Sequence, residues 1–251
     1  MPDASKPFIY LAVPCYGGQL TLHFVSSLLK LQEACRVRGV GLHVEMMGGE
    51  ALITRGRSRL AAQFLSHPDA THILFIDADI GFAPQNVFRL LDSGKDVIAA
   101  VCPLKTIDWE KVRIAAKAGV ADLQAAAIGY VVRFLPSADK SVEVNDGFAQ
   151  VSYGGTGFLM IRREAMQRIC DAHPDLRARM GDMADDNAPE AVMVFDTMIE
   201  RETGQYLSED YAFCRRWRDL GGEIWADFEA RLTHVGHAAY TGSLMQALRP
   251  G

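Results

Sequence analysis

The sequence predicts one α/β domain with a mostly parallel central sheet, flanked by helices and continued by a mixed or antiparallel C-terminal extension. Strand-like apolar runs alternate with helical patterns up to about residue 105, which is the order typical of a parallel sheet. After about residue 127, strand-like runs follow one another with only polar turns between them. Because 251 residues suffice for a sizeable core, we expect a single domain, 1–251, with a first half, 1–105, and a second half, 106–251.

Four strands and three helices are predicted in the first half. The strands are 7–13, 42–46, 73–76 and 97–102, and the helices are 20–38, 51–66 and about 84–92. The first strand breaks at Pro14–Gly18, where glycine allows a ligand to approach the backbone closely. Gly39 and Gly41 end the first helix, and Pro84 suits the first turn of the third.

The second half combines short strands with two helices. Strands are predicted at 128–134, 142–144, 149–153, 158–161 and 223–225, and helices at 162–170 and 208–220. Ser208 favours an N-cap, and the acids that follow it suit a first helical turn. Segment 173–191 is acidic and poor in large apolar residues, which predicts a mobile loop or lid. Leu232–Gly236 precedes a small terminal helix.

Composition excludes several classes of protein. A net charge of -5 argues against a surface that coats nucleic acid, so no nucleic-acid partner is expected. No apolar run approaches the roughly 20 residues that span a bilayer, and the N-terminus lacks a signal-peptide pattern, so we expect a cytoplasmic protein without a transmembrane segment. The five cysteines form no C-x-x-C pair, which argues against a disulfide framework or a zinc knuckle.

An acidic pair follows the third predicted strand. Asp77 and Asp79 are spaced i, i+2 at the end of an apolar run, and ligands of α/β sheets bind beyond the carboxyl ends of strands. Two neighbouring carboxylates repel unless a divalent cation or a network of donors neutralises them. The pair therefore suggests a metal-bound phosphate ligand. The alternative is that the two aspartates only end the strand and cap the next helix.

The order of four motifs resembles a known family. Asp77-Ala78-Asp79 is followed by Tyr153–Phe158, which is rich in glycine, by Ser208-Glu209-Asp210 and by His234. This order is similar to that of nucleotide-sugar-dependent, family 2-like glycosyltransferases with the GT-A fold. The resemblance covers nearly the whole chain, and Thr54–Ser58 resembles their basic segment before the D-x-D strand. It implies a Rossmann-like, GT-A type sheet with a nucleotide-binding half, 1–105, and an acceptor-side half, 106–251.

The resemblance also implies a division of labour among these residues. Asp79 would hold a divalent metal, Mn²⁺ or Mg²⁺, on the donor diphosphate, with Asp77 touching metal or ribose. His234 is the imidazole candidate for the metal site, and His237 is the competing ligand. The implied contacts with the nucleoside-diphosphate sugar come from Pro14, Tyr16, Arg57, Asp77, Ala78, Lys105, Gly155, Thr156 and Gly157.

Asp210 is the predicted catalytic base, which takes a proton from the acceptor hydroxyl if the reaction inverts configuration, and Glu209 would bind the acceptor. Acidic residues of this kind also make an ordinary helix N-terminus. Likewise, Arg57 and Lys105 are plausible phosphate contacts, although exposed basic residues are common. Tyr16 would stack on the nucleobase, with ordinary core packing as the alternative.

The sequence therefore predicts a metal-dependent enzyme that moves a sugar from a nucleoside-diphosphate sugar to a hydroxyl of a glycan or other acceptor. A haloacid-dehalogenase-like phosphohydrolase is one alternative, because it also uses D-x-D, and Gly181–Asp186 superficially fits its later motif. However, Asp175–Met180 lacks the apolar strand that should precede that motif. A sugar-nucleotide pyrophosphorylase lacks support because no arginine and lysine pair follows the first strand. A non-catalytic module that binds nucleotide sugar or glycan is the third alternative.

Overall fold

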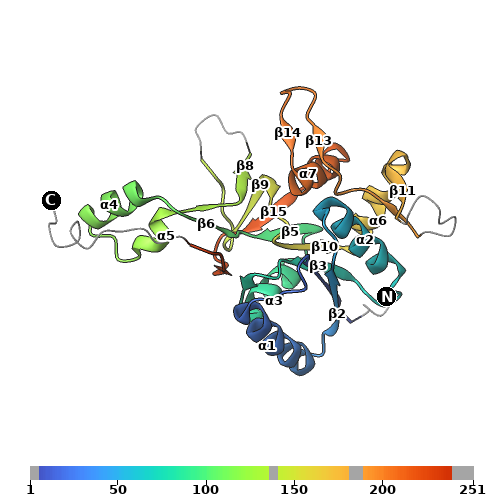
Figure 1. The fold of residues 1–251 in the computed structure, drawn as a ribbon, viewed down its shortest axis with the longest axis horizontal. Coiled ribbons are helices and arrows are strands. Elements are labelled where there is room, and N and C mark those ends of the chain that lie inside the picture. The colour runs from blue at the N-terminus through green and yellow to red at the C-terminus, as the bar shows by residue number, and fades with distance from the viewer. Residues whose placement is uncertain (1–5, 136–140, 181–188, 239–251) are drawn as a thin grey trace.

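The computed structural model describes residues 6–135, 141–180 and 189–238, and its centre is one eight-stranded sheet (Figure 1). The strand order is β2-β1-β3-β10-β5-β15-β9-β8. The bounds are Phe8–Cys15 for β1, Gly41–Gly48 for β2, His72–Ile76 for β3, Val97–Ala100 for β5, Val132–Phe134 for β8, Phe148–Gly154 for β9, Phe158–Arg162 for β10 and Ile224–Asp227 for β15.

The sheet is mostly parallel, as predicted. Strands β2, β1 and β3 are mutually parallel, and β5 is parallel to β15. Strand β10 is antiparallel to both β3 and β5, and β9 is antiparallel to both β15 and β8. Only β9 and β10 therefore run against the other strands of this sheet. The predicted fold class is confirmed, and β10 lies between two strands of the first half.

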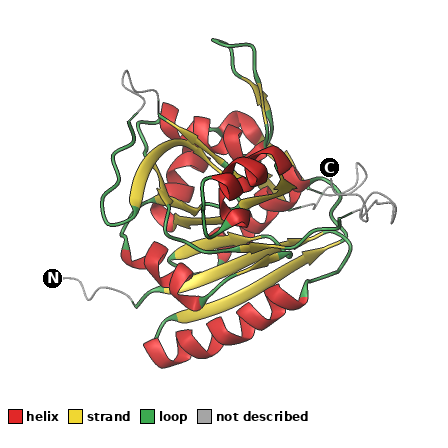
Figure 2. Ribbon diagram, turned by 90° about the vertical axis from the view of Figure 1, so that its left-hand side faces the viewer, coloured by secondary structure: helices red, strands yellow, loops and turns green. Residues whose placement is uncertain are grey.

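Helices cover both faces of the sheet (Figure 2). The helices are α1 (Leu22–Arg38), α2 (Ile53–Ser66), α3 (Pro84–Asp92), α4 (Trp109–Lys117), α5 (Leu123–Ala127), α6 (Arg163–Ala172) and α7 (Glu209–Asp219). Apolar residues of α2, α6 and α7 share one core cluster, and those of α1 and α3 share the other.

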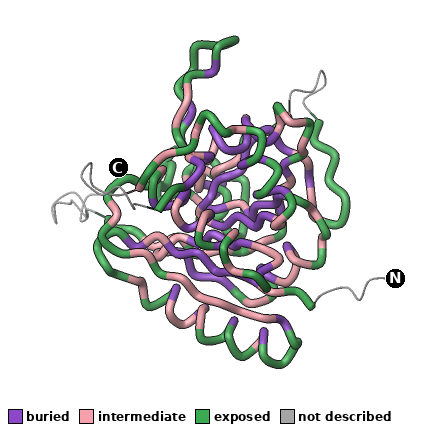
Figure 3. The backbone as a smooth tube through the Cα atoms, turned by 90° about the vertical axis from the view of Figure 1, so that its right-hand side faces the viewer, coloured by how far each residue is buried: buried purple, intermediate pink, exposed green. Residues whose placement is uncertain are grey.

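Strand β3 contributes to both clusters, since Phe75 belongs to the first and Leu74 to the second. Burial on both faces explains its unbroken apolar sequence. The buried segments accordingly run through the middle of the molecule in Figure 3.

The segment between β5 and β9 forms an excursion from the central sheet, made of two short strands and two helices, which the sequence did not predict. Strand β6 (Pro103–Ile107) pairs with β7 (Ile128–Tyr130), and α4 and α5 lie between them in sequence, at the end of the molecule away from α6 (Figure 1). Asp108 and Asp122 cap the two helices with their side chains. Only Ala115 and Ala127 are buried in these helices, so they carry little of the apolar periodicity that reveals a helix in sequence.

Two predictions in the second half are corrected. Residues 142–144 form no strand, and a bridge between Asn145 and Phe148 follows them. Segment 173–191 holds a short 3₁₀ helix, Pro174–Leu176, and β11 (Arg177–Arg179), which pairs with β12 (Glu190–Val192). Residues 181–188 and the predicted terminal helix lie outside the described residues.

Two further short pairings complete the described fold. Strand β4 (Ile80–Gly81) pairs with β16 (Thr233–His234), and β13 (Met198–Ile199) forms a hairpin with β14 (Tyr206–Leu207). Within the described part of the chain, none of the helices is both long and apolar enough to cross a membrane.

Candidate active site

Three of the four motifs meet beyond the end of β3. The backbone N–H of Asp77 donates to the carbonyl of Gly157 over 3.0 Å, which joins the acidic pair to the glycine loop 154–157. The pairing of β4 with β16 places His234 opposite Ile80, and Val235 N–H donates to the carbonyl of Asp79 over 2.9 Å. Backbone pairing therefore brings the late histidine beside the acidic pair.

The Asp79 carboxylate has two partners of different kinds. Its Oδ2 forms an ion pair with Lys105 Nζ, and its Oδ1 lies 3.4 Å from His234 Nε2. Oδ1 is buried and has no hydrogen-bond partner. A buried carboxylate oxygen without a partner is costly, so this atom is suited to a cation.

The orientation of the His234 ring is fixed from the other side. His234 Nδ1 lies 2.7 Å from the carbonyl oxygen of Pro103, and a carbonyl only accepts, so Nδ1 carries a proton and donates it. Nε2 is left facing Asp79. Metal-binding histidines commonly use one ring nitrogen in this way and present the other to the metal.

The predicted metal ligands do not all face one point. Asp79 and His234 lie together, whereas Asp77 Oδ1 accepts a hydrogen bond from Arg57 Nη2 over 2.9 Å. Among residues 6–135, 141–180 and 189–238, no group of three histidine, cysteine, aspartate or glutamate side chains is arranged to hold a metal ion. The protein therefore offers two close ligands in this part of the chain, and other ligands would have to complete the coordination.

Arg57 is placed differently from an exposed phosphate contact. Its side chain is 3% exposed, and its Nη1 donates to the carbonyl of Thr156 over 3.3 Å. Its Nε lies 3.5 Å from Glu209 Oε1. Arg57 thus lies beneath the site and contacts Asp77, the glycine loop and the start of α7.

The glycine loop needs its glycines for space. A Cβ on Gly157 would lie 3.2 Å from Asp77 Oδ2 and 3.3 Å from Cys102 Sγ, and one on Gly155 would lie 2.8 Å from Val131 Cγ1. Thr156, between the glycines, is buried. The loop therefore packs directly against the acidic pair.

Glu209 and Asp210 begin α7 next to this loop. A Cβ on Gly155 would lie 3.8 Å from Asp210 Oδ2, so Asp210 faces the loop. Burial raises the pKa of Glu209, the Arg57 guanidinium opposes that rise, and Asp210 adds to it. A raised carboxyl pKa beside a second carboxylate is frequent at functional sites.

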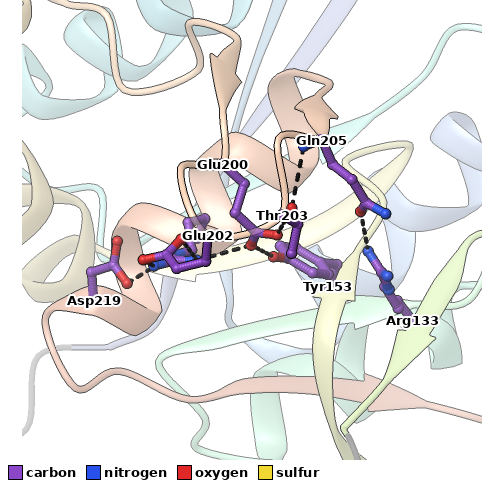
Figure 4. A network of polar contacts seen from close by, with 8 residues as sticks. Arg133, Tyr153, Glu200, Glu202, Thr203, Gln205 and Asp219 are labelled. Atoms are coloured by element: carbon purple, nitrogen blue, oxygen red, sulfur yellow. Dashed lines mark hydrogen bonds and ion pairs between the residues drawn. The ribbon is translucent and has the colours of Figure 1, made fainter.

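A polar network that sequence reasoning missed supports α7 and the loop (Figure 4). Buried Glu200 accepts hydrogen bonds from Tyr153 Oη over 3.0 Å and from Arg215 Nη1 over 2.8 Å. Thr203 Oγ1 also donates to this carboxylate. Tyr153 belongs to β9 just before the glycine loop, and Arg215 belongs to α7, so Glu200 ties the two elements together. No local pattern marks Glu200, because Tyr153 and Arg215 are distant from it in sequence.

The remaining predicted donor contacts lie at the open ends of strands. Tyr16 follows β1, and its side chain is 69% exposed, which excludes ordinary core packing. Pro14 is part of β1, and the carbonyl of Ala78 accepts a hydrogen bond from Thr21 N–H over 3.0 Å. The Gly181–Asp186 motif of the phosphohydrolase alternative lies outside the described residues.

A cavity of about 1230 Å³ adjoins the partners of Asp79. Lys105 and His234 line one part of it, and the β6–β7 pair, β8 and residues 228–238 supply other walls. Its aromatic lining consists of Tyr130, Phe134 and Phe228. Sequence reasoning did not find this cavity, since its walls come from short segments that only the fold brings together.

Comparison with solved structures finds the same kind of fold. The chain is similar to A197 from STIV, with 15% identity and a TM-score of 0.51 over 92% of this chain and 87% of that one. The catalytic domain of Drosophila β1,4-galactosyltransferase 7 in complex with xylobiose has 12% identity and a TM-score of 0.47 over 97% of this chain and 74% of that one. GalNAc-T7 with UDP, GalNAc and Mn²⁺ has 10% identity and a TM-score of 0.49 over 92% of this chain and 44% of that one.

No protein-family model matches the chain, and no curated protein sequence matches it. At identities of 10–15% these likenesses concern the fold alone. The chain thus shares its overall α/β fold with A197 from STIV.

Proposed function

We propose that this chain is a metal-dependent glycosyltransferase, which moves a sugar from a nucleoside-diphosphate sugar to a hydroxyl of a glycan or other acceptor. The observation that carries the proposal is the pair formed by Asp79 and His234. Asp79 Oδ1 is buried without a partner, and it faces a histidine nitrogen whose ring is oriented by Pro103. This arrangement supports a cation between the two side chains.

The donor set fits Mn²⁺, or Mg²⁺ where water fills the remaining positions of an octahedron. Asp79 and His234 would supply two ligands, and the diphosphate and water would supply the others. When bound, the metal neutralises the charge that develops on the departing diphosphate. Lys105, whose side chain is 39% exposed, can leave Asp79 and bind a phosphate oxygen.

The other residues serve the donor and the acceptor. Asp77, held by Arg57, would bind the ribose or contribute to the metal site, and Tyr16 would stack on the base. In an inverting reaction Asp210 accepts the proton of the acceptor hydroxyl. The hydroxyl oxygen then bonds to the anomeric carbon, and the electron pair of the broken carbon–oxygen bond goes to the diphosphate. Glu209 would bind the acceptor.

The phosphohydrolase alternative is less well supported. It needs the first aspartate as a free nucleophile, whereas Asp77 pairs with a buried guanidinium at 2.9 Å. Such a pair lowers the nucleophilicity of the carboxylate because it stabilises its charge. A non-catalytic binding module would differ in that it binds nucleotide sugar without ever releasing the diphosphate.

Thermal melting with nucleoside diphosphates tests the binding half of the proposal. One of ADP, GDP, UDP, CDP and dTDP should raise the melting temperature only when Mn²⁺ is present. At about 100 times Kd, we expect a gain of about 2.7 kcal/mol and a shift of roughly 5–10 °C. D79N should abolish the shift, whereas D92N, at an exposed ion pair with Arg38, should retain it. The proposal is wrong if no nucleoside diphosphate shifts the wild type with Mn²⁺ while phosphatase substrates are cleaved.

A further inference from the structure

The guanidinium of Arg57 contacts three segments whose relative positions matter for the proposed reaction: the end of β3, the glycine loop and the start of α7. We propose that Arg57 is a positioning residue, which keeps the donor-side Asp77 and the acceptor-side Glu209 at a fixed separation across the glycine loop. This inference rests on the proposed function of the site. It replaces the sequence-based expectation that Arg57 contacts a phosphate.

Each nitrogen of the guanidinium faces a different segment. Nη2 donates to Asp77 Oδ1 at 2.9 Å, beyond β3, and Nη1 donates to the Thr156 carbonyl at 3.3 Å, in the glycine loop. Nε lies 3.5 Å from Glu209 Oε1, in the first turn of α7, and has no hydrogen-bond partner. The donor side, the loop and the acceptor side therefore share one cation.

Only arginine suits this place. Its donors point in fixed directions within one plane, so a shift of any one partner disturbs the others. Lysine keeps the charge, but its three donors leave a single nitrogen, whereas the three acceptors here face three different nitrogens of the guanidinium. The guanidinium carbon also lies 5.6 Å from the centroid of the Phe75 ring, so the core beneath the site helps to hold it.

Burial separates Arg57 from a ligand contact. Its side chain is 3% exposed, whereas that of Lys105, which pairs with the other aspartate of the motif, is 39% exposed. Lys105 can therefore turn to an incoming phosphate, while Arg57 stays beneath the loop. In this account Lys105 binds the ligand, and Arg57 fixes the positions of protein groups around it.

The negative charges around Arg57 also require a cation at this position. Asp77 and Glu209 are both carboxylates, and removing a buried cation leaves such groups uncompensated. The pKa of Glu209 is already raised by burial, and Arg57 is the neighbour that opposes the rise. Without Arg57, we expect the two carboxylates to move apart.

The test compares R57K with R59K. Arg59 lies on the same helix, its side chain is 39% exposed, and its partner is Glu50, at 3.7 Å, which is not one of the proposed site residues. The measurements are melting temperature, affinity for the nucleoside diphosphate with Mn²⁺, and kcat and KM for transfer from the corresponding nucleotide sugar. We expect R57K to lose about 100-fold in kcat, because misplacement of about 1 Å costs that much. The affinity should fall by less than about tenfold, because Asp79, His234 and Lys105 would still hold the diphosphate. R59K should match the wild type in every measurement.

Two results would overturn the inference. A loss of affinity of tenfold or more in R57K, with a matching rise in donor KM, would make Arg57 a phosphate ligand. If R57K melts at a lower temperature than the wild type but has an unchanged kcat when assayed below that temperature, Arg57 is a purely structural residue. Both results differ from failure of the proposed function, in which the wild type itself binds no nucleoside diphosphate.

Discussion

His234 and His237 are three residues apart, and the structure separates their environments. His234 is oriented by Pro103 and faces Asp79, whereas His237 is exposed in the wall of the adjoining cavity. We predict that H234A weakens Mn²⁺-dependent binding of the nucleoside diphosphate by about 100-fold or more, since even a second-shell partner is worth 10–100-fold. Calorimetric titration of each variant measures this. H237A serves as the matched control, and a larger loss in H237A than in H234A would reverse the assignment.

Replacing Glu209 by glutamine is predicted to raise the stability of the protein and to lower its activity. Its pKa is raised on folding, so the folded state binds its proton more tightly than the unfolded state. Stability is therefore lost as the pH rises from the unfolded value through the folded value, and the ionised side chain is destabilising above that window. We predict that E209Q melts higher than the wild type at pH 7–8 and that this gain disappears below about pH 4.

The activity of the same variant decides whether this cost has a function. Transfer to the acceptor should fall in E209Q even though the fold is stabilised, as expected where a site is kept at the expense of stability. E164Q, at an exposed position on α6, should change neither property. A lower melting temperature for E209Q at pH 7–8 would contradict the account of its environment.

At the scale of elements, the glycine loop is the most sensitive segment. Gly157 does not need positive φ, so the effect of a methyl group there is steric: it would meet Asp77 Oδ2 at 3.2 Å and Cys102 Sγ at 3.3 Å. We predict that G157A costs about 1–3 kcal/mol of stability through overpacking and lowers kcat about 100-fold by displacing Asp77. Denaturant unfolding and initial rates measure the two effects.

Gly48 provides the matched control for this substitution. A Cβ at Gly48 would meet its nearest neighbours at 3.7 Å and 3.9 Å, which are ordinary contacts. G48A should therefore keep wild-type kcat. If G157A also keeps it, the loop does not determine the position of Asp77.

Strand β3 carries a pH-dependent group at its start. Burial, followed by the charge of Arg162, lowers the pKa of His72 to about 4. Since the unfolded histidine titrates near 6.5, the unfolded state binds the extra proton between pH 6.5 and 4, and stability is lost as the pH falls through that window. We predict that H72Q flattens this part of the melting-temperature profile. An unchanged slope would show that His72 is not the group responsible.

Elements that are buried on both faces were the easiest to predict. The apolar runs of β1, β3 and β5, and the helices between them, stand out because the sheet is covered on both sides. The excursion with α4 and α5 was missed because it buries little beyond two alanines. The two-residue pairing of β4 with β16 depends on tertiary contacts, as does the insertion of β10 between β3 and β5.

At the scale of the whole molecule, the sheet gathers residues from distant parts of the chain at one edge. The resemblance implied that Asp79 and His234 share a metal site, and the structure places His234 Nε2 3.4 Å from Asp79 Oδ1; the metal site itself stays a prediction. Arg57 was expected at this site, but its burial beneath the loop has no signal in sequence. The support of α7 by Glu200 and the shape of the cavity could not be predicted from the sequence either, because both depend on how separate segments pack.

The most direct test of the central claim is the release of nucleoside diphosphate from a nucleotide sugar, followed with and without Mn²⁺. The account predicts release that requires the metal, increases when an acceptor is supplied, and falls by at least about 100-fold in D79N. D92N, which lies at an exposed ion pair with Arg38, should release it at the wild-type rate. Release at the same rate without the metal, or an unchanged rate in D79N, would contradict the account.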